Sequence, residues 1–502
     1  MVSRMFSPSL EEVKKIGKNK EYKRIPIAYE LLSDIATPIE VLRILKGVSK
    51  HCYMLESVED SQKWGRYSFL GYDPILEFTC QNGTVRIRGD MNFENFSDDV
   101  ITIETDDPGE IIKDLIKKNK SPKLSLLPPF SGGFVGYFAY DYIKYAEPSL
   151  KLDAENQDQF KDIDLMLFDK VIAFDNFRQK IIIIINIKTD DLENNYNTAC
   201  EELKNIADLI KTGQKAKIKP LKLKTEFKPV FSREKYCDMV LKAKNYIHEG
   251  DIFQVVLSNK IEAEISGSLF DTYRVLRTTN PSPYMFYFSS DDIEIAGASP
   301  ETLVKLVDKK LYTFPLAGTR PRGKTDEEDL RLEKELLNDE KELAEHNMLV
   351  DLGRNDIGRI SEIGSVKVDK YLSIERFSHV MHIGSTVTGT LREGLDSLAA
   401  IDSILPAGTL SGAPKLRACE IINELEDNKR GIYGGAIGYV DLTGNIDTCI
   451  SIRIAFARNG KVFIRSGAGI VADSVPENEF DECLNKAAAV ISALETADGG
   501  LE

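Results

Sequence analysis

The segment Gly435–Ser474, GAIGYVDLTGNIDTCISIRIAFARNGKVFIRSGAGIVADS, has the clearest strand pattern of the chain. Its aliphatic and aromatic runs are separated by TGN and RNG, which are turn sequences of the hairpin type. We therefore predict three successive antiparallel strands. Arg453 stands inside the middle run, where an apolar residue is expected unless the strand lies at a sheet edge. Gly467 and Gly469 stand in the last run, and strand glycines usually mark a bulge or the close approach of a ligand.

Helical and strand patterns alternate around this segment. A helix is predicted after Ser232, whose side chain is suited to cap it, and a strand follows at residues 252–258. The last helix is predicted to begin after an Asp473 or Ser474 cap, with Pro476 in its first turn. This part of the chain therefore combines helices with antiparallel strands.

The preceding part is predicted to be rich in strands. Residues 1–210 contain many short strand-like runs separated by turn signals, and the aliphatic run IIIIINI at 181–187 predicts a buried strand. Residues 211–229 are rich in lysine, contain two prolines and show no amphipathic period, so we predict an exposed linker there. The chain is thus expected to divide into an N-terminal region, 1–210, and a second region, 230–502.

Composition narrows the classes of partner. The 502 residues carry a formal net charge of −15 without a basic footprint, which argues against a nucleic-acid partner. An anionic ligand would need local Arg, Lys, N–H groups or a metal to overcome this charge. The seven cysteines are scattered and never spaced CxxC, so a reducing cytoplasm fits best. No apolar run approaches the ~20 residues of a membrane span, so no membrane is expected.

Two carboxylates stand three residues apart in KELAEHNMLVDLGRND, residues 341–356. A long helix is predicted from an N-cap at Thr325. At ~100° per residue, Glu342 and Glu345 share the flank of its apolar stripe. A solvated acidic face is the simpler explanation of this stretch taken alone.

The last helix repeats the arrangement. Glu479, Glu482 and Lys486 line one edge of its apolar face, where a helix-stabilising pair of Glu482 and Lys486 would also explain the pattern. Taken together, four carboxylates that converge on one pocket would repel each other unless a hard cation lay among them. Mg²⁺ prefers oxygen ligands and can bridge to an anionic substrate. The two helices therefore predict a magnesium site.

Two further stretches carry weaker signals. His379 and His382 are three residues apart, but the alternating pattern around them predicts a strand that sends them to opposite faces, so they are not expected to share an ion. The loop PAGTLSGAPK, residues 406–415, could hold a carboxylate with its N–H groups and the Thr409 hydroxyl. It is not a Walker phosphate loop, because that spacing is absent.

Six ordered segments carry a resemblance to a known family: FPLAGTRPRG, KELAEHNMLVDLGRNDIGR, VMHIGSTVTGTL, PAGTLSGAPK, GGAIGYVDLTGNIDTCISIRIAF and RSGAGIVADSVPENEFDECLNKA. They closely resemble the chorismate-utilising enzymes, and among these most closely the large (component I) subunits of anthranilate synthases. GRYSFLGYDP and SGGFVGYFAYDY resemble the N-terminal region of those subunits, so the resemblance covers nearly the whole chain. It implies an α/β fold with a two-layered, mostly antiparallel β core wrapped by helices. It also implies Mg²⁺-dependent conversion of chorismate and ammonia to anthranilate and pyruvate, the first step of tryptophan biosynthesis.

The resemblance implies roles for the residues singled out above. Glu345 and Glu482 would bind Mg²⁺, with Glu479 supporting through water. Glu342 would be the general acid that assists loss of the chorismate C4 hydroxyl. His382 would serve the second step, in which pyruvate leaves and the ring becomes aromatic. The substrate would be held by Thr319, Tyr433, Arg453, Gly467, Ala468, Gly469 and Lys486, with Thr409 near the ring.

Two positions distinguish the chain from sister enzymes. Isochorismate and salicylate synthases carry a lysine in place of Gln254, because their nucleophile is water and needs a base. Aminodeoxychorismate synthases carry a lysine in place of Ala317, and that lysine attacks the ring covalently. Neither residue of this chain can do so, and direct attack by ammonia at C2 remains, with Gln254 among the catalytic residues.

The resemblance also implies partners. The chain has no nucleophilic-cysteine elbow followed by His and Glu, so a separate glutamine amidotransferase subunit is implied, in a heterotetramer of two large and two small subunits. Feedback inhibition by L-tryptophan is implied as well, because YMLESVED and NPSPYMFYF resemble the paired segments that form the tryptophan site in those subunits. The chemistry is suitable, since an indole needs an apolar, aromatic-walled slot and the ligand ammonium needs an acceptor such as Glu56. The predicted tryptophan site comprises Glu56, Ser57, Pro283, Tyr284 and Met285.

Two other hypotheses remain open at this point. One is an aminodeoxychorismate synthase component I, which the residue at position 317 argues against. The other is a non-catalytic amino-acid sensor of the same fold. A sensor would be expected to have lost some of the four helical carboxylates, and all four are present: Glu342, Glu345, Glu479 and Glu482.

Overall fold

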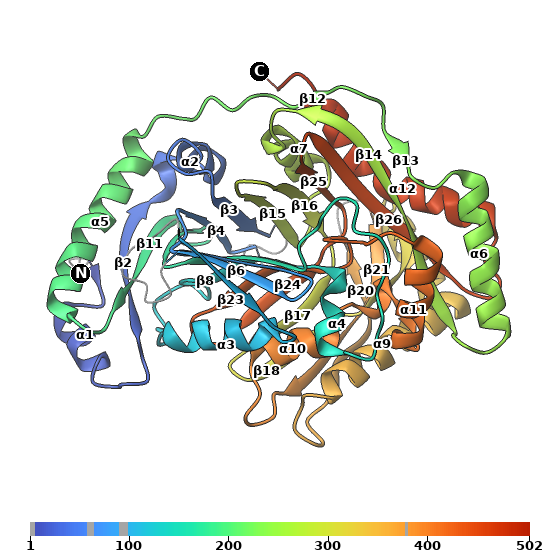
Figure 1. Ribbon diagram of the computed structural model, residues 1–502, viewed down its shortest axis with the longest axis horizontal. Coiled ribbons are helices and arrows are strands. Elements are labelled where there is room, and N and C mark those ends of the chain that lie inside the picture. Colours follow the sequence, from blue (N-terminus) through green and yellow to red (C-terminus); the bar gives the residue numbers. More distant parts are fainter. Residues whose placement is uncertain (1–5, 58–64, 90–98, 377–379, 502) are drawn as a thin grey trace.

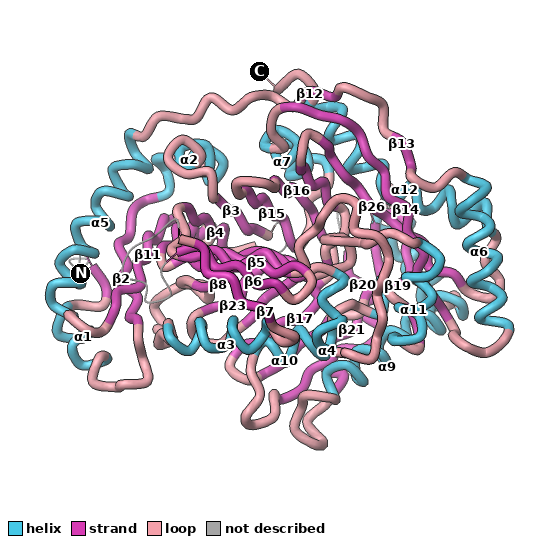
Figure 2. The backbone as a smooth tube through the Cα atoms, in the orientation of Figure 1, coloured by secondary structure: helices cyan, strands magenta, loops and turns pink. Residues whose placement is uncertain are grey.

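The computed structural model describes residues 6–57, 65–89, 99–376 and 380–501 (Figures 1 and 2). Within these residues the strands form two large antiparallel sheets, one of 14 strands and one of 12. The first sheet runs in the order β1 (Phe6–Ser7), β2 (Arg24–Leu32), β11 (Lys180–Lys188), β10 (Lys170–Asp175), β4 (Tyr67–Tyr72), β3 (Cys52–Glu56), β15 (Tyr284–Ser289), β16 (Glu294–Ser299), β25 (Ile454–Arg458), β26 (Lys461–Ile470), β14 (Gln254–Ser266) and β12 (Lys222–Leu223), while β13 (Lys228–Pro229) and β22 (Gly412–Ala413) also pair with β14. The second runs in the order β19 (Leu316–Pro321), β21 (Val380–Thr390), β18 (Lys310–Thr313), β17 (Thr302–Val307), β24 (Ile446–Ile450), β23 (Ala436–Asp441), β8 (Gly133–Phe138), β9 (Ile163–Phe168), β5 (Leu76–Gln81), β6 (Thr84–Gly89) and β7 (Val100–Glu104), with β20 (Lys367–Arg376) on β21.

The two sheets pack face to face through a layer rich in aromatic side chains. Tyr53 of the first sheet meets Phe168 of the second with ring centroids 4.7 Å apart, and Phe69 meets Tyr439 at 6.5 Å. Such aromatic pairs contribute to stability beyond the apolar area that they bury. The expected two-layered antiparallel core is therefore confirmed.

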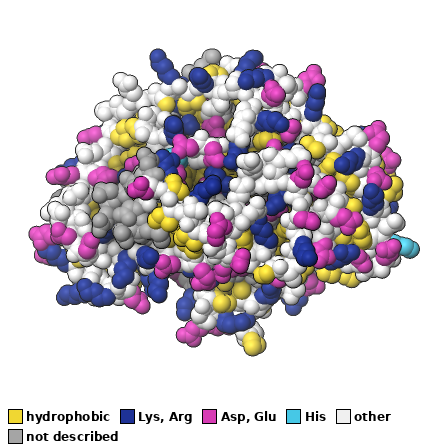
Figure 3. All heavy atoms as spheres, in the orientation of Figure 1, with side chains coloured by type: hydrophobic (Ala, Val, Ile, Leu, Met, Phe, Trp, Pro, Cys, Tyr) yellow, Lys and Arg dark blue, Asp and Glu magenta, His cyan; other side chains and the backbone are white. Residues whose placement is uncertain are grey.

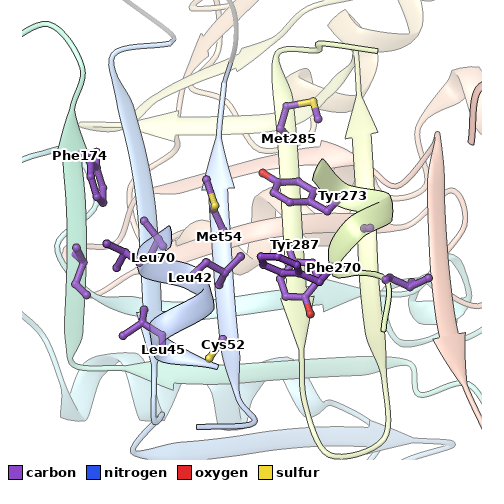
Figure 4. Packing of buried hydrophobic residues seen from close by; sticks show 14 of the residues in the cluster. Leu42, Leu45, Cys52, Met54, Leu70, Phe174, Phe270, Tyr273, Met285 and Tyr287 are labelled. Atoms are coloured by element: carbon purple, nitrogen blue, oxygen red, sulfur yellow. The ribbon is translucent and has the colours of Figure 1, made fainter. Parts of the chain in front are cut away.

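Helices cover the outer faces of the sheets, as expected for an α/β fold (Figure 2). They are α1 (Leu10–Ile16), α2 (Pro38–Leu45), α3 (Pro108–Lys118), α4 (Ile143–Ala146), α5 (Leu192–Thr212), α6 (Arg233–His248), α7 (Phe270–Thr279), α8 (Asp326–Leu337), α9 (Glu340–Gly358), α10 (Ser397–Ile404), α11 (Lys415–Glu426) and α12 (Pro476–Ala497). In Figure 4, Leu42 of α2 and Phe270 of α7 lie over Met54 and Tyr287 of the first sheet. The helical apolar faces thus bury the sheet surface that faces away from the aromatic layer.

The regions on either side of residues 211–229 contribute strands to both sheets. In the first sheet β3 pairs with β15, and in the second β8 pairs with β23. After α5 the chain crosses the top of the molecule to β12 and β13 (Figure 1). The expected strand at 181–187 is confirmed as β11, whose interior residues are all buried.

The segment Gly435–Ser474 differs from the prediction in one respect. It forms four strands, β23 to β26, because the middle run breaks at Ser451–Arg453. There Arg453 adopts a φ of 54°, a left-handed conformation that is uncommon for a residue with a side chain. β24 lies in the second sheet and β25 in the first, so the chain changes sheets at the break.

A second change of sheet lies directly beside the first. β16 of the first sheet leads into β17 of the second through Pro300 and Glu301. The Ile450 N–H donates to the Glu301 carbonyl at 2.9 Å, and the Ala298 N–H donates to the Arg453 carbonyl at 3.2 Å. We call residues 300–301 and 451–453 the paired corner.

Helix boundaries were partly predicted. Ser232 caps α6 and accepts from the Lys235 N–H at 3.3 Å, as expected. Thr325 also caps a helix, α8, as expected. However, α8 ends at Leu337 and α9 begins after a new cap, Asp339, so the prediction of a single long helix was wrong.

The last helix, α12, has Pro476 in its first turn as predicted, but it begins later than expected, because its cap position is Val475 rather than either predicted residue. The Ser474 hydroxyl instead accepts from the Val471 N–H at 3.1 Å. Among the described helices, none combines the length and apolar character that a membrane span requires. Figure 3 shows Lys and Arg side chains interspersed with Asp and Glu over one face of the molecule.

Candidate active site

The paired corner brings a carboxyl group into the molecule at Glu301. The Thr409 hydroxyl, on the short 3₁₀ turn Gly408–Leu410, donates to Glu301 Oε1 at 3.1 Å. Burial raises the pKa of the Glu301 carboxyl to about 7, against the smaller opposing effects of this hydrogen bond and of the Lys486 ammonium. A carboxyl group with such a pKa can hold a proton near neutral pH and release it, which is what a general acid requires.

The other strand of the corner supplies a cation. Burial lowers the pKa of Arg453, and among the described residues no carboxylate forms an ion pair with it. A partly buried guanidinium without a carboxylate partner is suited to bind one from a ligand. Tyr433 is buried nearby, and its hydroxyl lies 3.1 Å from the point where a Cβ at Gly467 would stand.

The glycines of β26 allow close approach, as their place in a strand suggested. A Cβ at Gly467 would stand 2.6 Å from the Leu257 carbonyl oxygen, and one at Gly469 would stand 2.7 Å from Gln254 Nε2. Ala468 between them faces the other way, into the apolar cluster beneath α6 and α11. The Gln254 amide therefore lies against the bare backbone of Gly469.

β21 contributes an imidazole, His382, that interacts electrostatically with Arg453. His382 Nδ1 lies 2.8 Å from the Gly318 carbonyl oxygen and 3.1 Å from Thr319 Oγ1. Because a carbonyl only accepts, Nδ1 carries the hydrogen and Nε2 carries the lone pair in the neutral ring. Burial lowers the pKa of His382, and the Arg453 guanidinium contributes in the same direction. The neutral imidazole, a base, is thus favoured.

Glu342, the predicted general acid, lies beside an arginine. Arg320 Nη1 lies 3.3 Å from Glu342 Oε1, and Arg320 Nη2 lies 2.8 Å from Asp339 Oδ2. Glu301, which the sequence patterns did not single out, is the carboxyl group of this region whose pKa burial raises to about 7.

The predicted metal ligands lie on α9 and α12. Burial raises the pKa of Glu345, and the Glu342 and Glu482 carboxylates raise it further. Burial and then the Glu482 carboxylate likewise raise the pKa of Glu479. Lys486 Nζ forms the expected helical pair with Glu482 at 2.6 Å and also donates to the Gly467 carbonyl at 3.2 Å.

These carboxylates are chemically suited to a hard cation, because they repel each other and offer oxygen donors. Within the described residues, however, no three His, Cys, Asp or Glu side chains are grouped closely enough to hold a metal ion. His379 lies outside the described residues, so its relation to His382 is not described.

The predicted tryptophan residues line one cavity of about 120 Å³ between the two sheets. Phe69 and Tyr439 provide aromatic walls on opposite sheets. Glu56 is not an open acceptor, because it accepts from the Tyr273 hydroxyl at 2.6 Å and from Arg277 Nη2 at 3.0 Å.

Met285 also differs from the expectation. Strand alternation turns its side chain away from the second sheet and toward Tyr273 of α7, whereas its neighbours Tyr284 and Phe286 face the aromatic layer (Figure 4). Met285 therefore borders the cavity from behind. Pro283 and Ser57 complete the predicted set along its lining.

Residues 50–492 match the family described as chorismate binding enzymes, and the chain belongs to that family. It is 46% identical to anthranilate synthase component 1 of Acetivibrio thermocellus, over 98% of this chain and 99% of that protein. The protein of the same name from Aquifex aeolicus is 45% identical with the same coverage.

Solved structures agree. The crystal structure of anthranilate synthase component I from Streptococcus pneumoniae is 39% identical, covers 92% of this chain and 98% of its own, and has a TM-score of 0.72. The menaquinone-specific isochorismate synthase MenF from Escherichia coli is 18% identical with a TM-score of 0.67, so it shares the fold. The chain is thus a chorismate-utilising enzyme, and these nearly full-length relatives at 39–46% identity are named anthranilate synthase component 1 or I.

Proposed function

We propose that this chain converts chorismate and ammonia to anthranilate and pyruvate. The observation that carries the proposal is the set of groups around the paired corner: the Glu301 carboxyl, the His382 imidazole and the Arg453 guanidinium. In addition, glutamine and alanine occupy the two positions where a lysine would change the nucleophile. Gln254 cannot act as a base for water, and Ala317, which pairs with Ile383 beside His382, cannot attack the ring.

In the first step ammonia attacks C2 of chorismate and the C4 hydroxyl leaves. Glu301 donates its proton to that hydroxyl, which departs as water, while the Thr409 hydroxyl holds the carboxyl group in place. We assign the general acid to Glu301 in place of Glu342 because the first carboxyl has the raised pKa and the second has an arginine partner.

In the second step His382 removes the proton from C2 through Nε2. The electrons of the C–H bond move into the ring, the C3–O bond breaks, and the side chain leaves as the enol of pyruvate. The hydrogen bond from Nδ1 to the Gly318 carbonyl supports this assignment, since it fixes the tautomer that has its lone pair on Nε2.

The substrate carboxylates are held by the groups that meet at β26. Arg453 supplies charge, Tyr433 a hydroxyl and Gly469 a bare backbone, while Lys486 stands at the rim. The close approach that Gly467 and Gly469 permit supports this arrangement.

Magnesium is the cation that this site is proposed to take. Glu345 and Glu482 would bind it directly and Glu479 through water; bound there, Mg²⁺ supplies positive charge for a substrate carboxylate. The Glu482 carboxylate contributes to raising the pKa of both Glu345 and Glu479, which supports the proposal, because a divalent cation would relieve that repulsion.

Ammonia is proposed to come from glutamine through a separate glutaminase subunit, component 2, in a cytoplasmic heterotetramer of two large and two small subunits. The name component 1, which the relatives carry, supports the existence of such a partner. The reaction would then be the first step of tryptophan biosynthesis.

Tryptophan is proposed to inhibit the enzyme from the cavity between the sheets. Tyr284 supports a structural coupling between this cavity and the active site. Its hydroxyl lies 3.0 Å from Thr302 Oγ1, and Thr302 directly follows Glu301 in the chain. The ligand ammonium would compete with Arg277 for Glu56. Binding would favour a conformation with poor affinity for chorismate, so inhibition would look competitive although it is allosteric.

The test is an assay of the purified chain with chorismate, Mg²⁺ and ammonium chloride at mildly alkaline pH. Anthranilate, seen by its fluorescence, is the expected product. Isochorismate as the main product would contradict the role assigned to Gln254, and aminodeoxychorismate would contradict that of Ala317. A chain that binds chorismate without turnover would support a sensor instead.

A further inference from the structure

Behind the substrate side of the site lies a buried cluster of three charged residues. Glu426 ends α11, Arg430 follows it in the loop, and Arg465 stands on β26. Each of the three side chains is about 1% exposed. Groups of this kind are almost never fully buried unless they are paired.

The cluster is closely connected by hydrogen bonds. Arg430 Nε donates to Glu426 Oε2 at 2.9 Å, and Arg465 Nη2 donates to the same oxygen at 2.7 Å. The Ser258 N–H donates to Glu426 Oε1 at 2.7 Å, and Arg465 Nε donates to Ser258 Oγ at 2.8 Å. One carboxylate is thus shared by two guanidinium groups.

The buried charge does not cancel. Arg430 and Arg465 carry two positive charges against the single negative charge of Glu426. The titratable neighbours Asp141 and Lys429, which interact with each other and border the cluster, add one charge of each sign. The group as a whole therefore has a net charge of +1.

Arg430 connects the cluster to the residues around the substrate. Its Nη1 donates to the Leu410 carbonyl at 2.6 Å, one residue after Thr409, and its Nη2 donates to the Val256 carbonyl at 2.7 Å. Val256 pairs in register with Gly469. The Arg430 guanidinium also lies 5.8 Å from the centroid of the Tyr433 ring.

Arg465 reaches the same place from the other side. It precedes Gly467 by two residues on β26, and Ser258, its hydrogen-bond partner, pairs in register with Gly467. The strand partners of Gly467 and Gly469 are thus each held by one of the two arginines.

We propose that Glu426, Arg430 and Arg465 form a positioning cluster that fixes Tyr433 and the Gly467–Gly469 backbone and presents one net positive charge to the substrate carboxylate. This inference rests on the proposed function, because it takes chorismate as the ligand. A buried ion pair is a poor source of stability, since removing charges from water is costly, and an uncompensated third charge is costlier still. A dicarboxylate ligand accounts for that cost.

Substitutions that change the net charge of the cluster in opposite directions distinguish this role from a merely structural one. Arg465→Gln removes the net charge, so KM for chorismate should rise about tenfold with little change in kcat, the scale for one unit charge ~12 Å from the substrate carboxylate at an effective dielectric constant of ~20. Arg465→Lys, which keeps the charge, should recover most of the affinity. Glu426→Gln doubles the net charge, so it should lower KM although it also removes buried hydrogen bonds and lowers Tm.

A matched control is Arg24→Gln. Arg24 is likewise a buried arginine, donating to Asn119 Oδ1 at 2.6 Å and to the Asn186 carbonyl at 2.9 Å, but it stands on β2, in the N-terminal part of the first sheet. It should lower Tm and leave KM unchanged. Equal increases of KM in Arg465→Gln and Glu426→Gln would overturn the proposal. If Arg465→Gln fails to fold, Glu426→Gln decides alone: a lower KM supports the cluster and a higher KM contradicts it.

The failure of the proposed function would be recognised separately. Chorismate binding by the parent chain and the variants is measured by calorimetry in the presence of Mg²⁺ without ammonia. A parent that binds no chorismate contradicts the proposed function itself. A parent that binds, with affinities that do not follow the sign of the charge change, contradicts only the positioning cluster.

Discussion

Glu301→Gln should make the enzyme inactive and, at alkaline pH, more stable. The folded chain raises the pKa of this carboxyl from 4.5 to about 7 by burial. An acid whose pKa is raised by folding binds more protons in the folded state between those values, so stability falls as the pH rises through this window. The penalty is absent below pH ~4.5 and complete above pH ~7.

The size of the effect follows from the two pKa values. The difference of about 2.5 corresponds to about 3 kcal/mol of lost stability when the penalty is complete. About 1.4 kcal/mol of this develops between pH ~6 and pH ~8.5. Gln is neutral throughout. The difference in unfolding free energy between Glu301→Gln and the parent should therefore increase by that amount, in favour of the variant, between the same two pH values.

The measurement is urea unfolding followed by circular dichroism at pH 6 and pH 8.5, without added metal. Turnover measured alongside should fall by ~10²–10⁴-fold, the range for a lost general acid. Asp402→Asn on α10 calibrates the assay, because burial raises the pKa of Asp402 to about 6 and the residue has no role in the chemistry. It should show the same direction with activity retained. A constant stability gap between Glu301→Gln and the parent, or undiminished turnover, would refute the reasoning.

Further predictions concern the metal, the nitrogen source and the inhibitor. Glu345→Gln or Glu482→Gln should raise the Mg²⁺ concentration for half-maximal turnover about tenfold or more, and full activity in excess EDTA would rule out a metal site. The chain alone should form anthranilate from ammonium salts but none from glutamine until a glutaminase subunit is added; glutamine-dependent turnover by the pure chain would contradict this. Ser57→Phe should abolish tryptophan inhibition and spare ammonia-dependent turnover, and an unchanged inhibition curve would place the inhibitor elsewhere. Met285→Thr should do the same indirectly, through the packing of α7, with a loss of about 1–3 kcal/mol in unfolding free energy.

Local patterns predicted the local structure well. The capping serine Ser232 located the start of α6, and Pro476 lies in the first turn of α12 as expected, because these signals act within one turn. The break between α8 and α9 was missed, because the helical composition on both sides of it is strong. Asn338 and Asp339 cause the break, and Asp339 is itself a good cap.

Features that depend on distant partners were harder to predict. Arg453 looked like an irregular strand residue, because the change of sheet at this point is set by pairing with other strands. Glu301 gave no periodic signal, and its pKa depends on burial beside Thr409, 108 residues away. A charged residue directly after Ser-Pro, between two strand patterns, was the only signal that could have indicated it.

The paired corner also has a consequence for how the chain acquires its structure. Strands from both regions pair in both sheets, and two of the links between the sheets lie at residues 300–301 and 451–453. Neither sheet can be completed before the strands of the other have paired. Contacts of large sequence separation must therefore form together, which slows folding. A chain cleaved within residues 211–229 would give two fragments with exposed strand edges, prone to aggregate alone and able to assemble only when mixed.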